Sequence, residues 1–196
     1  WHRSFPNSDA IPELCGKTVG LVGYGAVAQL VAGYLKAFGS RIIAFDPYFA
    51  GDPALAELVN LDFLMKNSDI VSLHARLTDE SYHLIGEKEL AMMKPTAVLV
   101  NTARSGLVDE PALARALEDK RIAGAALDVF DEEPLPADHP FVCLENVTIT
   151  AHLAGSTIDS FKNSPRMMAG HLRNCLAGCG NLPVVNGIRP LLKAGR

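Results

Sequence analysis

The fold of this 196-residue chain is indicated most clearly by one stretch, Thr18-Val19-Gly20-Leu21-Val22-Gly23-Tyr24-Gly25-Ala26-Val27-Ala28. Its first five residues form a short apolar run typical of a buried strand, and a glycine turn follows directly. Beyond the turn, apolar residues recur at helical spacing until Gly39, which supplies a stop. They are Val27, Leu30, Val31, Tyr34, Leu35 and Phe38. The stretch therefore predicts a strand, a tight turn and a helix in succession.

The same alternation of short apolar runs and helical patterns continues along the chain. Further strands are expected at 41–45, 70–73, 97–100, 123–127 and 147–149. Helices are expected over 110–117, directly after Asp109, and over about 156–176. Strands alternating with helices are typical of βαβ units. The predicted fold class is α/β, a doubly wound parallel sheet of the Rossmann type, without internal repeats or low-complexity linkers.

Composition excludes several kinds of partner. The chain is 48% hydrophobic and 20% charged, as in ordinary globular proteins. The formal net charge is −4 and no basic run stands out, so we expect no nucleic-acid partner and no membrane surface as partner. No apolar stretch has the length of a membrane span, and the residues from Trp1 to Pro6 do not resemble a signal peptide.

The four cysteines, Cys15, Cys143, Cys175 and Cys179, have no framework spacing. Cysteines of this kind suit a reducing compartment, and a cytoplasmic protein is expected. His171, Cys175 and Cys179 are spaced to share one helix face that could hold a metal. Gly178 and Gly180 would disrupt that face and no fourth ligand is evident, so small buried residues near a helix end are favoured and no metal is predicted.

The glycine turn predicts a dinucleotide cofactor. Gly23 permits the tight turn, Gly25 lets the backbone approach a pyrophosphate, and Ala28 keeps helix and sheet close in place of a third glycine. Free N–H groups from about Ala26 and Val27 would bind the phosphates. The alternative is a pair of turn glycines without a ligand, but a strand before the turn, a helix after it and an acidic residue at the next strand end favour the cofactor.

Asp46, at the end of the second strand, favours NAD over NADP. Its carboxylate would accept hydrogen bonds from the adenosine ribose and repel a 2′-phosphate, and Pro47 and Tyr48 offer no compensating charge.

Four later segments carry a family resemblance. They are Ser68-Asp69-Ile70-Val71-Ser72-Leu73-His74, Val100-Asn101-Thr102-Ala103-Arg104, Ala126-Leu127-Asp128-Val129-Phe130-Asp131-Glu132-Glu133-Pro134 and Thr150-Ala151-His152-Leu153-Ala154-Gly155-Ser156-Thr157. Together they closely resemble the D-2-hydroxyacid dehydrogenases, most closely the phosphoglycerate dehydrogenase-like branch. The resemblance covers nearly the whole chain in the right order. It implies an NAD-dependent enzyme that transfers a hydride between nicotinamide and a D-2-hydroxy or 2-oxo acid.

The resemblance implies three catalytic residues. Arg104 would grip the substrate carboxylate, which its place at a strand end also permits. His152 would donate a proton to the carbonyl oxygen or accept one in the reverse direction. Glu133, the Glu directly before Pro134, would hydrogen-bond the imidazole and stabilise the imidazolium. Without the motif, Arg104 would be expected to form an ion pair at the surface, and the run Asp131-Glu132-Glu133 would be expected to be a solvated acidic loop. Four other histidines are expected to be bystanders: His2, His83, His139 and His171.

The resemblance also implies where the cofactor binds. Asp128 would bind the nicotinamide side, and His74, Ala75, Thr102 and Ala103 would line the cleft. The full set expected to bind NAD is Gly23, Tyr24, Gly25, Ala26, Val27, Asp46, His74, Ala75, Thr102, Ala103, Arg104, Asp128, His152 and Gly155.

Three positions depart from the family pattern. Arg76 stands where Pro usually follows His-x, Ser105 replaces the Gly after the catalytic Arg, and Ala151 replaces a common Pro before the His. None removes a reacting group, so these departures concern loop geometry. Arg76 would soften the preference against NADP if it reached the ribose.

Family members also contain a substrate-binding domain, which is expected to be largely absent from this chain. Residues 1–181 are predicted to form the NAD-binding domain, and residues 182–196 a tail leading toward the missing domain. The chain is therefore expected to be the cofactor part of a larger enzyme, and relatives imply a homodimer formed through this domain. The substrate's side chain is not predicted, because its selectivity would come largely from the missing domain.

A second function remains open at this point. Corepressors that sense NAD(H) share the fold and can keep the catalytic triad, and turnover on 2-oxo acids would distinguish the two. Formate dehydrogenases typically have Gln where this chain has Glu133, which argues against that chemistry.

Overall fold

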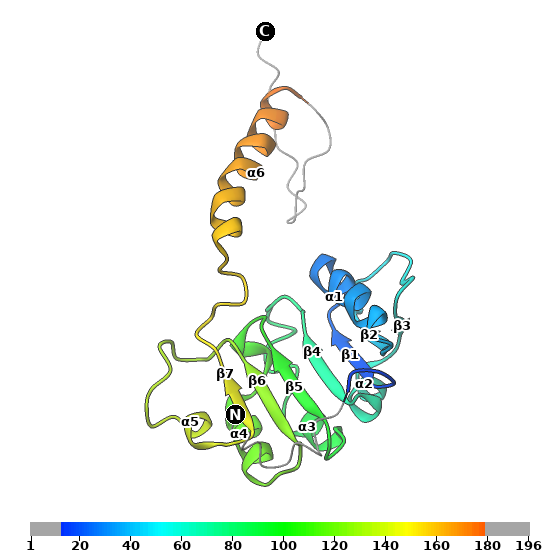
Figure 1. Cartoon of the computed structure of the whole chain (residues 1–196), viewed down its shortest axis with the longest axis vertical. Helices are drawn as coiled ribbons and strands as arrows, with labels where there is room; N and C mark the ends of the chain where they lie inside the picture. The colour runs from blue at the N-terminus through cyan, green and yellow to red at the C-terminus, as the bar shows by residue number, and fades with distance from the viewer. Residues whose placement is uncertain (1–12, 179–196) are drawn as a thin grey trace, which may run out of the picture. The chain divides into compact units, whose positions relative to one another are not determined.

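A computed structural model describes residues 13–178 of the chain (Figure 1). The chain divides into two compact units, Trp1–Ala151 and His152–Arg196. The predicted tail at 182–196 lies outside the described residues.

The first unit is built on a seven-stranded sheet in the order β3-β2-β1-β4-β5-β6-β7, and every neighbouring pair is parallel. The strands are β1 (Thr18–Val22), β2 (Arg41–Phe45), β3 (Glu57–Leu58), β4 (Ile70–Leu73), β5 (Val98–Asn101), β6 (Gly124–Leu127) and β7 (Val147–Ile149). The chain builds outward from β1 to β3, then returns to place β4 on the other side of β1. The order therefore reverses between β1 and β4, where doubly wound folds bind ligands.

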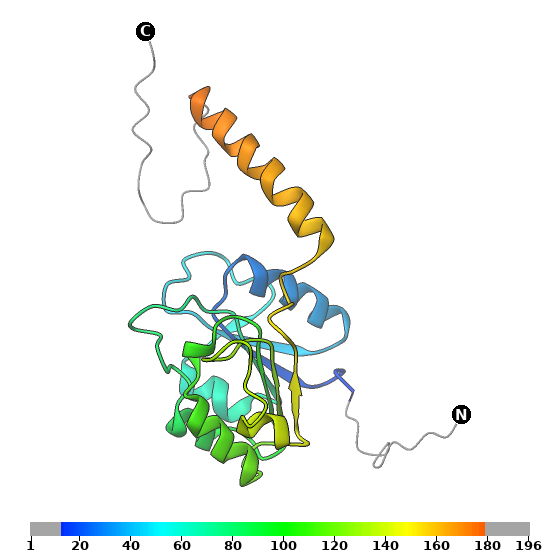
Figure 2. The same ribbon diagram turned by 90° about the vertical axis from the view of Figure 1, so that its left-hand side faces the viewer.

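Helices cover both faces of this sheet, with α1 on the side opposite α3 and α4 (Figures 1 and 2). The helices of the first unit are α1 (Ala26–Ala37), α2 (Leu61–Asn67), α3 (Glu87–Met92), α4 (Glu110–Glu118) and α5 (Pro140–Cys143). Successive strand residues point to opposite faces. Val19 and Leu21 accordingly pack with α1, whereas Val22 packs in the larger cluster with α2, α3, α4 and α5.

The predicted doubly wound α/β fold is confirmed, and most expected elements agree within two residues. The strand expected at 97–100 runs from Val98 to Asn101, and the helix expected from about residue 156 begins at Ile158. Five short elements were not predicted: β3, α2, α3, α5 and a 3₁₀ helix at Ser105–Leu107. Each has at most seven residues, too few for a clear periodic pattern.

The apolar pattern of α1 has two faces. Ala28 and Ala32 are buried against the sheet because their small side chains let the helix approach it closely. On the outer side, side chains remain largely in solvent and form what we call the α1 stripe: Val27 (65% exposed), Leu30 (64%), Tyr34 (68%) and Phe38 (61%). The helical spacing seen in the sequence therefore combines a core face and an exposed apolar face.

The second unit contains α6 (Ile158–Leu176). Thr157 is the N-cap of this helix and forms a reciprocal capping box with Ser160. The Ser160 amide donates to Thr157 Oγ1 at 3.0 Å, and the Thr157 amide donates to Ser160 Oγ at 3.2 Å. No helix within residues 13–178 is long and apolar enough to cross a membrane.

Asp69 ties together the amino ends of three central strands. Its Oδ2 accepts from the Thr18 amide at 2.8 Å, its Oδ1 accepts from Lys94 Nζ at 2.8 Å, and its carbonyl accepts from the Val98 amide. Burial alone would raise the pKa of Asp69. The hydrogen bonds from Lys94 and Thr18, with the positive charge of Lys94, outweigh burial and lower the pKa below its ordinary value.

Replacing Lys94 by Met should destabilise the first unit at neutral pH by up to about 1 kcal/mol, the usual range for a partly exposed ion pair. Because the folded-state pKa of Asp69 is lowered, its contribution is present above the unfolded-state pKa, about 3.9, and is lost as pH falls through the folded-state value. Urea unfolding should thus give a lower free energy of unfolding for Lys94→Met than for the unmodified chain at neutral pH, and equal values at strongly acidic pH. Lys88→Met, which removes more exposed ion pairs, is the matched control. A deficit that persists after Asp69 is protonated would contradict this account.

Candidate functional site

Six residues follow directly after the carboxyl ends of neighbouring strands, one after each strand. The last residues of β2, β1, β4, β5 and β6 are paired in register, as are Leu127 of β6 and Ile149 of β7. The residues that come next therefore form one row along this edge: Asp46, Gly23, His74, Thr102, Asp128 and Thr150. Five of the six were predicted as site residues, and Thr150 was not.

Gly23 lies where two chain segments pass very close together. Its φ is +88°, and a Cβ at this position would lie 2.5 Å from the Ala75 amide nitrogen. Its own amide donates to the Phe45 carbonyl at 2.7 Å. Only glycine fits this combination of positive φ and backbone contact. The turn after β1 and the segment after β4 are thereby held side by side.

Gly25 serves a different purpose in the same turn. It is the N-cap of α1 with φ −75°, and a Cβ there would meet no atom within 4 Å. The first turn of α1, which begins with Ala26 and Val27, has no acidic residue and no side-chain cap. The helix N-terminus therefore offers free N–H groups and a partial positive charge to an anion, and nothing at Gly25 obstructs its approach.

Asp46 is fixed by the backbone on both sides. Its Oδ2 accepts from the Tyr24 amide and its Oδ1 from the Tyr48 amide, at 2.8 and 2.9 Å. The Tyr24 side chain is buried with its ring edge-on to Phe49, at a centroid distance of 5.1 Å. Tyr24 therefore contributes to the site through its backbone. The carboxylate of Asp46 is held in one orientation with lone pairs remaining for a ligand's hydroxyl groups.

Two open cavities adjoin along this edge. The first, of about 740 Å³, is lined by residues that include Gly23, Gly25, Asp46 and Tyr48. The second, of about 550 Å³, is lined by residues that include Val27, Thr102, Ala103 and Arg104. The two share His74, Ala75 and Arg76 as a common wall. Together they form a cleft, which we call the edge cleft, that is large enough for a dinucleotide.

His74 is the most enclosed ionisable group of the common wall. Its Nε2 lies 3.0 Å from Ser72 Oγ, and its amide donates to the Val22 carbonyl. Burial lowers the pKa of His74, so the imidazole is neutral at neutral pH. It therefore shapes the wall without adding charge.

Arg104 brings a positive charge to the second cavity. The guanidinium is exposed, and its Nη1 donates to the Ala103 carbonyl at 2.6 Å. Within the described residues it has no carboxylate partner. The segment that carries it is held by Asn101, which accepts from the Ala103 amide and donates to the Arg104 carbonyl. Asn101 is a supporting residue that sequence reasoning assigned no role, although a strand-end Asn commonly bonds to backbone two residues on.

Asp128 and Glu133 both follow β6. Asp128 is buried, its amide donates to the Asn101 carbonyl, and its Oδ1 accepts from Thr150 Oγ1 at 2.5 Å. Glu133 is exposed, and its Oε1 accepts from the Phe130 amide at 3.0 Å. Thr150 is thus a functional neighbour that sequence reasoning missed, and its place directly after β7 was the available signal.

His152 and Gly155 belong to the second unit. His152 has φ +53°, a left-handed conformation that is uncommon outside glycine. The carbonyl of Gly155 accepts from Ser160 Oγ at 3.0 Å. The first unit therefore brings together the cofactor-side residues and Arg104, while His152 and Gly155 belong to the other unit.

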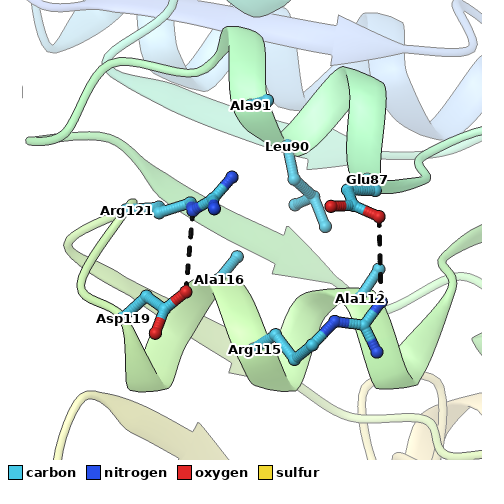
Figure 3. A pocket seen from close by; sticks show the side chains of 8 residues that line it. All are labelled: Glu87, Leu90, Ala91, Ala112, Arg115, Ala116, Asp119 and Arg121. Atoms are coloured by element: carbon cyan, nitrogen blue, oxygen red, sulfur yellow. Dashed lines mark ion pairs between the residues drawn. The ribbon is translucent and has the colours of Figure 1, made fainter.

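Other candidate sites are weaker. A small pocket of about 70 Å³ lies between α3 and α4 (Figure 3), but its arginines already face acids: Arg115 pairs with Glu87 at 4.0 Å and Arg121 with Asp119 at 3.7 Å. Within residues 13–178, no three His, Cys, Asp or Glu side chains are grouped to hold a metal. Cys179 of the considered metal set lies outside the described residues.

The strand order, the glycine turn and the edge cleft define a dinucleotide-binding domain. Residues 1–154 match the family model "D-isomer specific 2-hydroxyacid dehydrogenase, NAD binding domain", and the chain belongs to this family. NAD is accordingly its cofactor.

Relatives agree with this membership. The chain is 43% identical over 190 residues to a glyoxylate reductase of Thermofilum pendens, covering 93% of this chain and 56% of that protein. It is 43% identical over 170 residues to a D-3-phosphoglycerate dehydrogenase of Methanocaldococcus jannaschii, covering 85% and 32%. The NAD-complexed crystal structure of a D-isomer specific 2-hydroxyacid dehydrogenase from Lactobacillus delbrueckii ssp. bulgaricus is 34% identical with a TM-score of 0.82, covering 91% and 59%. The chain thus spans only part of the length of these relatives.

The two turn glycines should respond differently to alanine. Gly25→Ala should leave thermal stability unchanged, because φ is ordinary and the space is open, yet weaken NADH binding by about tenfold or more, because the added methyl faces the cofactor's approach. Gly23→Ala should lower the melting temperature, because positive φ and the Ala75 backbone both oppose a Cβ. Calorimetric titration with NADH and thermal denaturation separate the two effects. If Gly25→Ala binds NADH as well as the unmodified chain, the dinucleotide does not approach this turn.

Proposed function

We propose that this chain is the NAD-binding part of an oxidoreductase that interconverts D-2-hydroxy acids and 2-oxo acids, of the phosphoglycerate dehydrogenase-like kind. The observation that carries the proposal is the position of Arg104. Its guanidinium lines the cavity next to the one that contains Asp46, without a carboxylate partner among residues 13–178. A cation free to bind a substrate carboxylate at one end of a dinucleotide cleft suits this chemistry.

The residues of the edge cleft support one orientation of NAD, with the adenosine in the first cavity and the nicotinamide in the second. The adenosine ribose would bind the fixed carboxylate of Asp46, and the pyrophosphate would lie at Gly25 and the start of α1. The nicotinamide end would lie beside Thr102 and Ala103, with Asp128 on the β6 side. When bound, NAD supplies or accepts the hydride.

Arg104 is proposed to hold the substrate carboxylate, bidentately where the geometry allows. His152 would supply the proton to the carbonyl oxygen during reduction and accept it during oxidation. Glu133 would orient the imidazole and stabilise its protonated form. The support for His152 and Glu133 is their place in the family motifs, since the two belong to different units.

The described cysteines Cys15, Cys143 and Cys175 are free thiols, which supports a reducing, cytoplasmic setting for the protein.

The α1 stripe supports the proposal of a homodimer formed through this domain. Its four large apolar side chains are each more than 60% exposed on one helix, and exposed patches of this kind commonly mark protein interfaces. Sedimentation of the chain at micromolar concentration should show a dimer, and Leu30→Glu should shift it to monomer. A monomer without any substitution would contradict this part of the proposal.

In the complete enzyme, His152→Ala or Arg104→Ala should lower kcat/KM by about 10²–10⁴-fold, because each removes a group that acts on the reacting atoms. NADH affinity should change little. His171→Ala and Arg115→Ala, which remove the same chemical groups elsewhere, are the controls. Near-normal turnover of 2-oxo acids by His152→Ala or Arg104→Ala would remove that residue from the mechanism.

NAD should bind more tightly than NADP, because the 2′-phosphate would meet the fixed carboxylate of Asp46. Asp46→Ala should narrow the gap between the two cofactors, and Asp52→Ala, on the exposed loop nearby, should not. Calorimetric affinities for both cofactors provide the measurement. Equal affinities in the unmodified chain would show that Arg76, which lines the common wall, overrides Asp46.

A further inference from the structure

A buried carboxylate lies beneath the loop that carries Glu133. This carboxylate belongs to Glu110, the first residue of α4, which is only 9% exposed. Its Oε1 accepts from the Asp131 amide at 2.8 Å, and its Oε2 lies 3.5 Å from His139 Nε2. The carboxylate therefore bridges the two ends of the segment 131–139 that follows β6.

His139 is held in the orientation that this bridge needs. Its Nδ1 accepts from the Phe141 amide at 3.3 Å, so a neutral ring carries its proton on Nε2, which faces Glu110. The ring also packs against Phe141, with centroids 4.8 Å apart, and Phe141 is fully buried. His139 is therefore fixed with its Nε2 directed at the Glu110 carboxylate.

Keeping a charge at this place is energetically unfavourable. Burial raises the pKa of Glu110, and the nearby negative charge of Asp131 acts in the same direction, while the Asp131 amide and His139 oppose them. A buried charged pair is weak evidence for stabilisation, because apolar residues of similar volume often serve equally well. Among residues 13–178, the polar partners of this carboxylate are the Asp131 amide and His139. Its contacts point to a role in setting the conformation of the loop.

The loop amide that Glu110 binds is next to the one that Glu133 binds. The Phe130 amide donates to Glu133 Oε1, and the following amide, that of Asp131, donates to Glu110 Oε1. Two consecutive N–H groups are thus held by two carboxylates, one buried and one exposed. Glu133 lies at the surface and is bonded to this backbone, so a change in the turn moves one of the groups that hold its carboxylate.

We propose that Glu110, oriented by His139, is a positioning residue that fixes the turn at residues 130 and 131 and thereby aims the carboxylate of Glu133. This inference rests on the proposed function, in which Glu133 orients His152. A side chain that acts through hydrogen bonds needs a rigid support, because misplacement by about 1 Å can cost about 10²-fold in rate.

The test uses three variants on α4. Glu110→Ala removes the acceptor for the Asp131 amide, and Glu110→Gln keeps an amide oxygen that can accept from it. Leu113→Ala removes buried packing from the same helix and leaves the hydrogen bonds to the Phe130 and Asp131 amides in place. His139→Asn keeps a cap for the Phe141 amide but loses the contact with Glu110. This last variant tests the same contact should Glu110→Ala fail to fold.

Amide hydrogen exchange on the chain and steady-state kinetics on the complete enzyme give independent readouts. Glu110→Ala should speed exchange at Phe130 and Asp131 and lower kcat about tenfold or more, with KM for NADH unchanged. Glu110→Gln should show exchange rates and a kcat close to those of the unmodified protein. The values for His139→Asn should lie between those of Glu110→Gln and Glu110→Ala. Leu113→Ala should lower stability but leave kcat per folded molecule near normal.

Unchanged exchange at residues 130 and 131 in Glu110→Ala would overturn the inference, as would an equal loss of kcat in Leu113→Ala. Faster exchange without any loss of kcat would overturn it as well. The proposed function fails separately, if the unmodified enzyme turns over no 2-oxo acid or if Glu133→Gln has no effect on its rate. In that case the exchange data would still report whether Glu110 holds the loop.

Discussion

The close passage of two backbones at Gly23 is the constraint on which the rest of the structure depends. The turn after β1 meets the segment after β4 with no room for a side chain between them, since a Cβ would lie 2.5 Å from the Ala75 nitrogen. This contact occurs where the strand order reverses, so α1 leaves toward one face while the later helices cover the other. Because the two segments touch, the adjoining cavities share the wall formed by His74, Ala75 and Arg76. One small residue thus makes the edge cleft continuous.

Parallel pairing explains how the cleft acquires its chemistry. All neighbouring strands run in one direction and their last residues are in register, so the residue after each strand joins a common row. The row has a fixed carboxylate at Asp46 and a buried one at Asp128. Between them lie the glycine turn at Gly23 and the neutral imidazole of His74. Arg104 follows this row by two positions and is steadied by Asn101. The site is therefore a consequence of strand ends rather than of one local motif.

The same geometry determines what could be predicted from the sequence. The alternation of apolar strands and helices predicted the doubly wound fold, and Asp46 was expected as a ligand-binding residue from its place at a strand end. His74, Thr102 and Asp128 were expected from the family resemblance, and the structure places each of them directly after a strand. Short elements such as β3 and α5 were missed, because a few residues carry no periodic signal. The two faces of α1 were not separated either, since alanines provide the buried face. Supporting contacts were the least predictable. Glu110 and His139 meet across 29 positions of sequence, and Thr150 meets Asp128 across 22, which only the packed structure reveals.

We propose that the edge cleft holds NAD with the adenosine at Asp46 and the nicotinamide beside Thr102 and Arg104. A crystal structure of the chain with bound NADH tests this most directly. Electron density is expected along the cleft, with the ribose hydroxyls on the Asp46 carboxylate, the pyrophosphate at Gly25 and the nicotinamide ring in the cavity lined by Arg104. A dinucleotide bound in the reverse direction, or bound away from the row of strand ends, would contradict it.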